Sequence, residues 1–304
     1  MKKFSILFFA LMLSTSLVFA QGNESDVNSV GTSNDVVVDQ IGLTNISDVD
    51  QDGTDNQAKV DQFGTTNDAK IDQSGLNGAG SGIFNQATAT QIGPDNSSIQ
   101  LQYGDNNTAT VYQEEYYGNG GNIATQQQGV GYAEGNTADI FQWGDYNRSD
   151  QQQYYDNNEA YSTQLGIGNQ SDQYQSSPTD SDPGSIATNN QWGFDNHNKQ
   201  TQVGGYDNTA TNTQGVQPLA ASNNWTDQNQ VGNGNTATTE QGTTIVASAG
   251  NNSDIDQIGD NNTAFDHQEG NLNQATTLQT GNLHKSTTFQ HGSSNTATVT
   301  QSNF

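Results

Sequence analysis

The chain has 304 residues, of which 33 are acidic and 7 are Lys or Arg, so its formal net charge is −26 at pH 7. Only 30% of the residues are hydrophobic, and Leu, Ile, Val and Phe together make up about 17% of the chain, which is typical of disordered proteins and too little for an ordinary enzyme core. The negative charge argues against binding to nucleic acid or to anionic membrane surfaces, since both require a basic surface.

Residues 1–20 have the features of a secretory signal peptide. Two lysines form a charged start, a mostly apolar stretch follows, and Val18-Phe19-Ala20 places small residues where cleavage before Gln21 requires them. A membrane anchor is the alternative, but the apolar stretch is short for a span. We therefore expect an exported chain with a signal peptide at 1–20, one domain at 21–304 and no membrane insertion. Because the sequence has no cysteine, no disulfide holds that domain together.

From Asn23 onward, a seven-residue unit of the form Asn-x-(Ala/Ser)-x-x-x-Gln repeats along the chain. A link of four residues, usually with Gly second, follows each unit. The chain holds 23 units, and 15 of the 22 start-to-start intervals are eleven residues long. The extra residues of the longer intervals fall in links such as 75–84 and 176–184, where Gly, Pro, Ser and Asp cluster. An array of short elements joined by turns tolerates such insertions.

Each unit alternates in the way that a β-strand does. In Asn56–Gln62, the first, third, fifth and seventh side chains are Asn, Ala, Val and Gln and share one face, whereas Lys59 and Asp61 lie on the other. The charged residues mark the solvent face, so the Asn/Ala/Val/Gln face is the predicted interior. The third position is Ala or Ser in 20 of 23 units, which predicts two sheets packed closely together.

An interior of Asn and Gln is costly unless every amide finds a hydrogen-bond partner. Identical amides stacked about 4.8 Å apart can satisfy one another along a ladder. We therefore expect structural amide ladders at the first and seventh positions. These ladders include Asn56, Gln62, Asn67, Gln73, Asn107, Gln113, Asn136, Gln142, Asn235, Gln241, Asn262, Gln268, Asn295 and Gln301.

The fifth position indicates how many units make one coil. Gln occupies it in alternate units, counted from the N-terminus, at Gln100, Gln126, Gln151, Gln173, Gln200 and Gln228. The intervening units carry Ala, Val, Ile, Ser or Asn there. This alternation predicts that two units form a coil, with odd units in one sheet, even units in the other, and an extra Gln ladder in the odd sheet alone. The predicted fold is all-β, a two-sheet parallel β-solenoid of about eleven coils.

The motif Gln-x-Gly-x-x-Asn-x-Ala-x-x-x-Gln, which Gln102–Gln113 and Gln257–Gln268 fit without a gap, resembles the curlin repeat of curli subunits. The resemblance covers about 280 residues. It implies a cross-β solenoid that polymerises end to end into extracellular amyloid fibres, which support adhesion and aggregation in bacterial biofilms. The implied partners are further copies of the chain in a head-to-tail homopolymer, a nucleator subunit and outer-membrane export machinery.

The chain departs from the family pattern in two respects. Familiar members have about five longer repeats, whereas this chain has about twice as many coils. They also carry a Gly-rich leader after signal cleavage that addresses the export pore, whereas the first unit here begins at Asn23.

No pattern of residues proposes a reaction, a cofactor or a metal site. The four histidines lie in different units, and no cysteine or local nucleophile motif accompanies them. The segment Asp48–Gly53 imitates the start of a calcium-binding loop, but Lys59 stands where such a loop needs Glu. We therefore expect a protein that is not an enzyme.

The alternative to a fibre subunit is a monomeric secreted solenoid that binds ice, a glycan or a surface. Ice binding requires a regular outward array of threonines, which residues such as Asp139 and Tyr161 interrupt. A monomeric solenoid also needs capping segments, because open strand edges recruit further strands. The units begin two residues after the expected cleavage site and end three residues before Phe304, so we expect open edges at both ends and favour the polymer.

An odd number of units leaves two arrangements for the joint between copies. With 23 strands, the even sheet has one strand fewer than the odd sheet. The first strand of the next copy then fills the vacancy beside the last even strand, so the odd units of that copy continue the even sheet of the first copy. The first unit has Ser25, Val27 and Ser29 at inward positions and lacks the final Gln. If this unit does not form a strand, 22 strands make eleven whole coils, and odd units stack on odd units across the joint.

Overall fold

The computed structural model describes residues 22–74, 82–115, 120–129, 134–176, 183–215, 221–242 and 248–303. The expected signal peptide at 1–20 lies outside the described residues. Within the described ranges every regular element is a β-strand. No helix in this part of the chain is long and apolar enough to cross a membrane.

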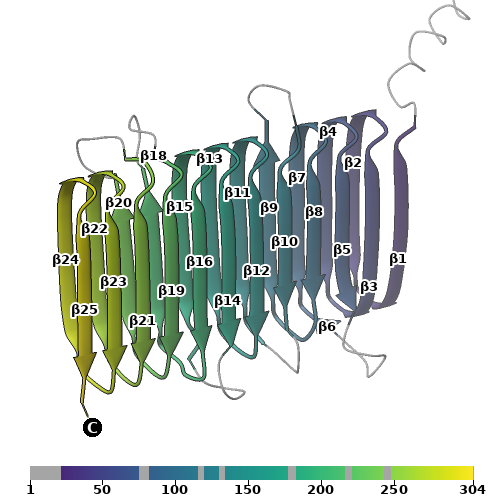
Figure 1. Ribbon diagram of the computed structural model, residues 1–304. Coiled ribbons are helices and arrows are strands. Elements are labelled where there is room, and N and C mark those ends of the chain that lie inside the picture. Colours follow the sequence, from purple (N-terminus) through teal and green to yellow (C-terminus); the bar gives the residue numbers. More distant parts are fainter. Residues whose placement is uncertain are drawn as a thin grey trace, which may run out of the picture.

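Two parallel sheets lie face to face and extend from the N-terminal to the C-terminal end of the chain (Figure 1). The first sheet has the spatial order β1 (Glu24–Thr32), β3 (Ile46–Thr54), β5 (Asp68–Ser74), β8 (Ser97–Gln102), β10 (Ile123–Gln128), β12 (Arg148–Tyr154), β14 (Gln170–Ser176), β16 (His197–Val203), β19 (Trp225–Val231), β21 (Asn252–Ile258), β23 (Gln274–Thr280) and β25 (Thr296–Ser302). The short β6 (Gly82–Ile83) pairs with β3.

The second sheet lies opposite and takes the alternate strands of the chain. Its order is β2 (Asp35–Leu43), β4 (Gln57–Thr65), β7 (Gln86–Pro94), β9 (Thr108–Glu114), β11 (Thr137–Asp145), β13 (Glu159–Ile167), β15 (Ile186–Phe194), β17 (Thr209–Gln214), β20 (Thr236–Gln241), β22 (Thr263–Asn271) and β24 (Lys285–Ser293). The short β18 (Ala221–Ser222) pairs with β15.

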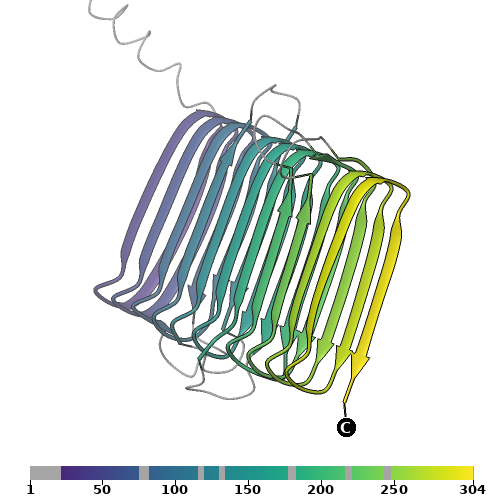
Figure 2. The same ribbon diagram turned by 90° about the vertical axis from the view of Figure 1, so that its left-hand side faces the viewer.

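Successive units of the repeat therefore alternate between the sheets, and two units make each coil (Figure 2). All the pairings are parallel and in register. In the second sheet Ala109 pairs with Ala138, and Gln113 pairs with Gln142. The predicted fold class, an all-β two-sheet parallel solenoid with odd and even units in separate sheets, is confirmed.

Side chains alternate between the interior and the solvent along each strand. In β9 the burial alternates residue by residue, and Ala109, Val111 and Gln113 are fully buried. Small side chains at the third position let the two sheets approach, so the interior is thin and holds far more amides than large apolar groups. The described strands thus bury a core in which hydrogen bonds replace much of the usual aliphatic packing.

The links turn through glycines that stack in a column. Gly144, Gly166 and Gly193 all have positive φ, at 120°, 126° and 123°. A Cβ on Gly166 would lie 1.9 Å from the carbonyl oxygen of Gly193 in the next coil. Only glycine fits this combination of backbone angle and close approach, which explains why the second link residue is so often Gly.

The first unit of the repeat forms a strand in the structure. β1 pairs with β3 over nine residues, and the Ser47 hydroxyl donates to the Ser25 hydroxyl at 2.9 Å. The arrangement in which the first unit forms no strand is therefore wrong, because the backbone ladder and these side-chain contacts continue to residue 24. Strands β1 and β25 are the outermost strands of the same sheet in the described chain, so its described part forms eleven coils and one further strand.

Candidate functional site: amide ladders and open ends

The asparagines at the first position form a ladder that connects successive coils. The Asn107 Oδ1 accepts from the backbone N–H of Asn136 at 3.1 Å and from its Nδ2 at 3.2 Å. Nδ2 atoms in this column also donate to the carbonyls of the stacked link glycines, as Asn122 does to Gly144 at 2.8 Å. Each asparagine therefore holds both the next coil and the turn of a neighbouring strand.

The glutamines at the seventh position form a second ladder with a fixed direction. The Gln113 Nε2 donates to the Gln142 Oε1 in the next coil at 2.9 Å and to the backbone carbonyl of Ser97 in the opposite sheet at 3.0 Å. One amide hydrogen thus runs along the stack and the other crosses the interior. Since the donors point toward the C-terminal end in every described coil of this ladder, the two ends of the solenoid present different groups.

The structure places the fourteen residues of the expected ladders in such columns, with one Asn column and one Gln column in each sheet. Twelve of them are buried; the other two, Asn295 and Gln301, are respectively exposed and half-buried because they lie in the last coil. The Gln301 Oε1 accepts from the Gln279 Nε2 at 2.8 Å, and the Asn295 Nδ2 donates to the Asn273 Oδ1 at 2.9 Å. The buried pair Gln62 and Gln91 has the same geometry with a contact of 2.8 Å.

The fifth-position glutamines of the first sheet also bond to one another in sequence. The Nε2 of each donates to the Oε1 of the next at 2.8–3.0 Å along the series Gln100, Gln126, Gln151, Gln173, Gln200 and Gln228. At its N-terminal end the series meets Ile71, and the Gln100 Oε1 has no hydrogen-bond partner among the described residues. At the other end the Gln228 Nε2 donates to the Thr239 hydroxyl of the opposite sheet at 3.1 Å.

Asp266 departs from the expectation that charged residues mark the solvent face. It holds a fifth position in β22 and is fully buried. Its carboxylate accepts from the Ser253 hydroxyl at 3.0 Å and from the Thr277 hydroxyl at 3.3 Å. Burial raises the pKa of Asp266, and the hydroxyl donors oppose that shift. The expectation is wrong at this position, and counting along the unit from Asn262 identifies it.

A pair of carboxylates that the repeat pattern does not single out lies in the turns of the second sheet. Glu115 occupies the position that Gly93 and Gly144 hold in the adjacent coils, and its side chain lies against Gly93. Among the described residues, neither oxygen of Glu115 has a hydrogen-bond partner, and one oxygen of the buried Asp145 also lacks one. Burial raises the pKa of Glu115 to about 7, and repulsion from Asp145 and Asp95 adds to the shift.

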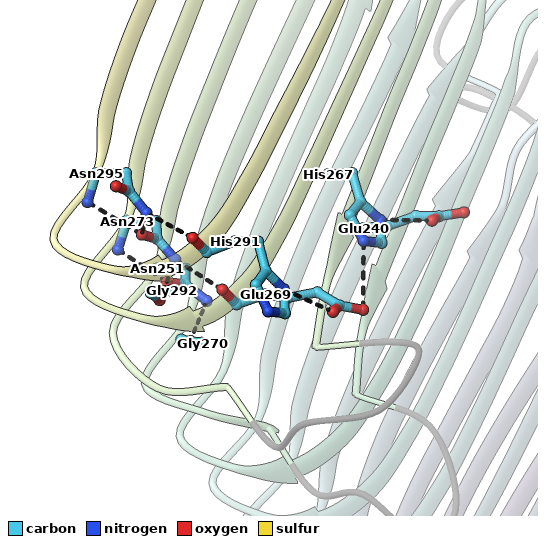
Figure 3. Close-up of polar contacts among 9 residues, drawn as sticks. All are labelled: Glu240, Asn251, His267, Glu269, Gly270, Asn273, His291, Gly292 and Asn295. Carbon is cyan, nitrogen blue, oxygen red and sulfur yellow. Dashed lines mark hydrogen bonds and ion pairs between the residues drawn. The ribbon is translucent and has the colours of Figure 1, made fainter.

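A chain of carboxylates and imidazoles connects three coils near the C-terminal end (Figure 3). The His267 Nδ1 lies 3.1 Å from Glu240 Oε2, and its Nε2 lies 3.4 Å from Glu269 Oε1. The other oxygen of Glu269 lies 3.3 Å from the His291 Nδ1. The Glu269 side chain is only 6% exposed, and its backbone carbonyl accepts from the Asn273 Nδ2 at 3.1 Å, which connects this group to the asparagine ladder.

No group of three or more His, Asp or Glu in the described ranges is arranged to hold a metal ion. Asp48 and Asp50 lie outward on β3, and Asp48 contacts the Lys70 ammonium at 3.3 Å instead of facing a common centre. The described part of the chain therefore offers hydrogen-bonded ladders and strand edges as its organised features.

A family model described as the curlin associated repeat matches residues 45–75, which span β3, β4 and β5. No curated protein matches the chain. The matched segment contains two successive members of each amide column in the first sheet, Asn45 with Asn67 and Gln51 with Gln73.

Proposed function

We propose that this member of the curlin-repeat family is a secreted structural subunit that assembles end to end into extracellular amyloid fibres. In this proposal residues 1–20 are removed on export, and the domain at 21–304 forms the fibre at the bacterial surface, where it supports biofilm, adhesion and aggregation. Its partners are further copies of itself, with a nucleator subunit and outer-membrane export machinery as the family resemblance implies. The curlin repeat and the solenoid fold are structural features, and no catalytic role is proposed.

One observation carries this proposal: the ladders end in complementary groups at opposite ends of the stack. The Gln290 Nε2 and the Gln301 Nε2 each donate to a backbone carbonyl of the opposite sheet, but the described chain has no further glutamine to accept the second amide hydrogen. At the other end the Oε1 of Gln40 has no donor among the described residues. A second copy placed head to tail supplies what each end lacks.

The backbone edges provide most of the contact. The N–H groups at even positions of a unit donate to the following coil, as Gln86 donates to Asn107 and Tyr103 donates to Gln128, both at 2.8 Å. In β25 these groups belong to Thr296, Thr298 and Thr300, and β25 has no following strand in the described chain. An unpaired row of this kind is a template for strand addition, as in other cases of β-augmentation.

The test is whether the processed chain recovered from cells forms fibres, and whether an edge proline prevents it. We expect fibres with a diffraction spacing of about 4.7–4.8 Å along the axis. Thr298→Pro removes one N–H from the free edge of β25 and leaves the bonds between β25 and β23 in place. This variant should therefore fold but fail to elongate. Added in small amounts to the unmodified chain, this variant should shorten the fibres. Its unmodified N-terminal end can still bind to a fibre, and its altered β25 edge then prevents the next copy from binding.

Thr276→Pro provides the matched contrast, since it removes an N–H that faces a neighbouring strand and should unfold part of the solenoid, as circular dichroism would show. An unmodified chain that stays monomeric would leave the rival, a monomeric binding module, as the better account.

A further inference from the structure

The two ends of the solenoid carry opposite charge. The head end, residues 22–55, has no Lys, Arg or His and carries eight carboxylates, at Glu24, Asp26, Asp35, Asp39, Asp48, Asp50, Asp52 and Asp55. The tail end, residues 270–304, has no acidic residue and carries Lys285, His284 and His291. In a chain with a net charge of −26, the tail therefore carries a charge that attracts the head.

Lys285 differs from the other cations of the solenoid. Lys59, Lys70, Arg148 and Lys199 each contact an aspartate of this chain, at distances from 2.6 to 3.9 Å. Lys285 is exposed at the first residue of β24, which is the last strand of the second sheet in the described chain, and has no ion-pair partner among the described residues. Its ammonium lies beside the place where the next strand of that sheet would bind.

We propose that copies join by a half-coil step in which β1 of the incoming copy binds beside β24, so that its Glu24 stacks on Lys285. This inference rests on the proposed fibre function and specifies its joint. The first sheet of one copy continues as the second sheet of the next, so neighbouring copies are related by about half a turn around the fibre axis. Register in every described pairing aligns equal positions of the unit, which places residue 24 opposite residue 285 at one strand spacing, about 4.8 Å.

The inward side chains fit this joint. The incoming β2 then binds beside β25 and stacks Val36, Val38 and Gln40 on Ala297, Val299 and Gln301. Valine meets alanine and valine, and the free Oε1 of Gln40 meets the free amide hydrogen of Gln301. The apolar cluster of the head, in which Val36 and Val38 are only partly buried, is thereby covered.

Two other joints are possible between the same ends, but each of them leaves strand pairings unmade. In a whole-coil joint β2 binds beside β24 and Lys285 meets Asp35, but β1 must first leave β3 and lose a nine-residue ladder. If β1 instead binds beside β25, one strand position in the second sheet stays empty at every joint. The half-coil step alone keeps β1 in place and leaves no vacancy.

Charge swaps in the processed chain distinguish these joints. Elongation from preformed fibres is measured for Lys285→Glu, for the double variant Lys285→Glu/Glu24→Lys and for Lys285→Glu/Asp35→Lys. We expect Lys285→Glu to slow elongation about fivefold, because like charges then face each other across the joint. Glu24→Lys should restore the rate, and Asp35→Lys should not. Lys199→Glu, which changes the net charge equally in the middle of the solenoid, should leave elongation within about twofold.

The outcomes separate the joint from the fibre function. Restoration by Asp35→Lys would overturn the half-coil joint in favour of the whole-coil joint. If Lys285→Glu elongates at an unchanged rate, or if neither second substitution restores the rate, Lys285 and Glu24 are not in contact at the joint. In both cases the fibre function stands, whereas an unmodified chain that forms no fibres overturns both. High-resolution fibre images provide a second measurement, since they show directly whether neighbouring copies are rotated by about half a turn.

Discussion

At the scale of single residues, Gln126 shows how a buried amide can use all its hydrogen-bonding groups. The Gln126 Nε2 donates to the Gln151 Oε1 at 3.0 Å and to the Thr110 carbonyl of the opposite sheet at 3.0 Å, and its own Oε1 accepts from the Gln100 Nε2. A buried polar side chain is tolerated here because none of its groups lacks a partner. Replacing the amide by a group with no N–H donors breaks two of these bonds at once.

Gln126→Glu should therefore destabilise the chain by more than about 3 kcal/mol at neutral pH, since it buries a charge and removes both donors. The neighbouring Gln127→Glu lies on the outward face of β10 and should change stability by no more than about 0.5 kcal/mol. Denaturant unfolding of the two variants measures the difference. Equal losses of stability would show that the inward direction assigned to Gln126 is wrong.

The raised pKa of Glu115 should make the stability of the fold depend on pH, and substitution of this residue should remove that dependence. Its pKa in the folded state is raised to about 7, so the folded chain holds a proton that the unfolded chain releases at lower pH. This carboxyl therefore weakens the fold as the pH rises from about 4.5 to 7. Glu115→Gln should increase the unfolding free energy at pH 8 by about 1 kcal/mol and have little effect at pH 5.

The matched control is Glu114→Gln, which removes one charge from the adjacent residue. Glu114 accepts a hydrogen bond from the Tyr112 hydroxyl at 2.6 Å, and a glutamine can accept the same bond. A pH profile that Glu115→Gln and Glu114→Gln change alike would mean that Glu115 carries no special cost.

At the scale of the elements, the close stacking of the turns limits which residues the links can hold. Where successive links have the standard length their glycines stack, and the close approach of the backbones leaves no room there for a side chain. A side chain in this column meets the backbone of the next coil. Glu115 shows the exception, because in its coil the backbone has a different angle and the side chain lies over Gly93.

Gly166→Ala should destabilise the solenoid by at least about 2 kcal/mol, because φ is 126° and the added Cβ collides with the Gly193 carbonyl. Gly204→Ala tests backbone angle alone: φ is 70° there, and the nearest atom to the added Cβ is 3.9 Å away. Its cost should be about 1 kcal/mol. Thermal unfolding of both variants separates the two effects, and equal midpoints would mean that the close approach at Gly166 does not matter.

At the scale of the whole molecule, the buried and half-buried carboxylates make stability depend on pH in one direction. Burial raises the pKa of Asp150, Asp254 and Asp266; repulsion from Asp172 adds to the shift at Asp150, and repulsion from other aspartates adds to that at Asp254. These carboxyls thus bind more protons in the folded chain than in the unfolded chain between the ordinary carboxyl pKa values near 4 and the raised values. In that window their contribution to the free energy of unfolding rises as the pH falls.

We therefore expect the processed chain and its fibres to resist denaturant better at pH 5 than at pH 7. Added salt should also help at pH 7, because it screens repulsion between strongly acidic subunits. Denaturation midpoints at the two pH values, each at low and moderate salt, check both statements. A midpoint that falls steadily on acidification from pH 7 to pH 5 would contradict the first.

The sequence by itself determined the strands, their faces and their division into two sheets. A strand places alternate side chains on opposite faces, so the period-two pattern of Asn56–Gln62 is sufficient to assign inward and outward positions. The Gln that recurs in every second unit from Gln100 to Gln228 shows which units stack, because identical amides gain most when they lie on one another. Both arguments need only local periodicity and in-register stacking.

Only the tertiary structure decided which groups lack partners. Glu115 is shielded because its neighbours in space are Gly93 and the turn of Asp145, and the unequal links hide that neighbourhood in the sequence. The Ser253 and Thr277 hydroxyls that contact Asp266 both come from the opposite sheet, so the packing of one sheet against the other selects them. Lys285 has no ion-pair partner among the described residues because it lies on β24, which no further strand follows in that sheet of the described chain. In each case the deciding contact is long-range and not periodic, which is the reason that the repeat pattern could not reveal it.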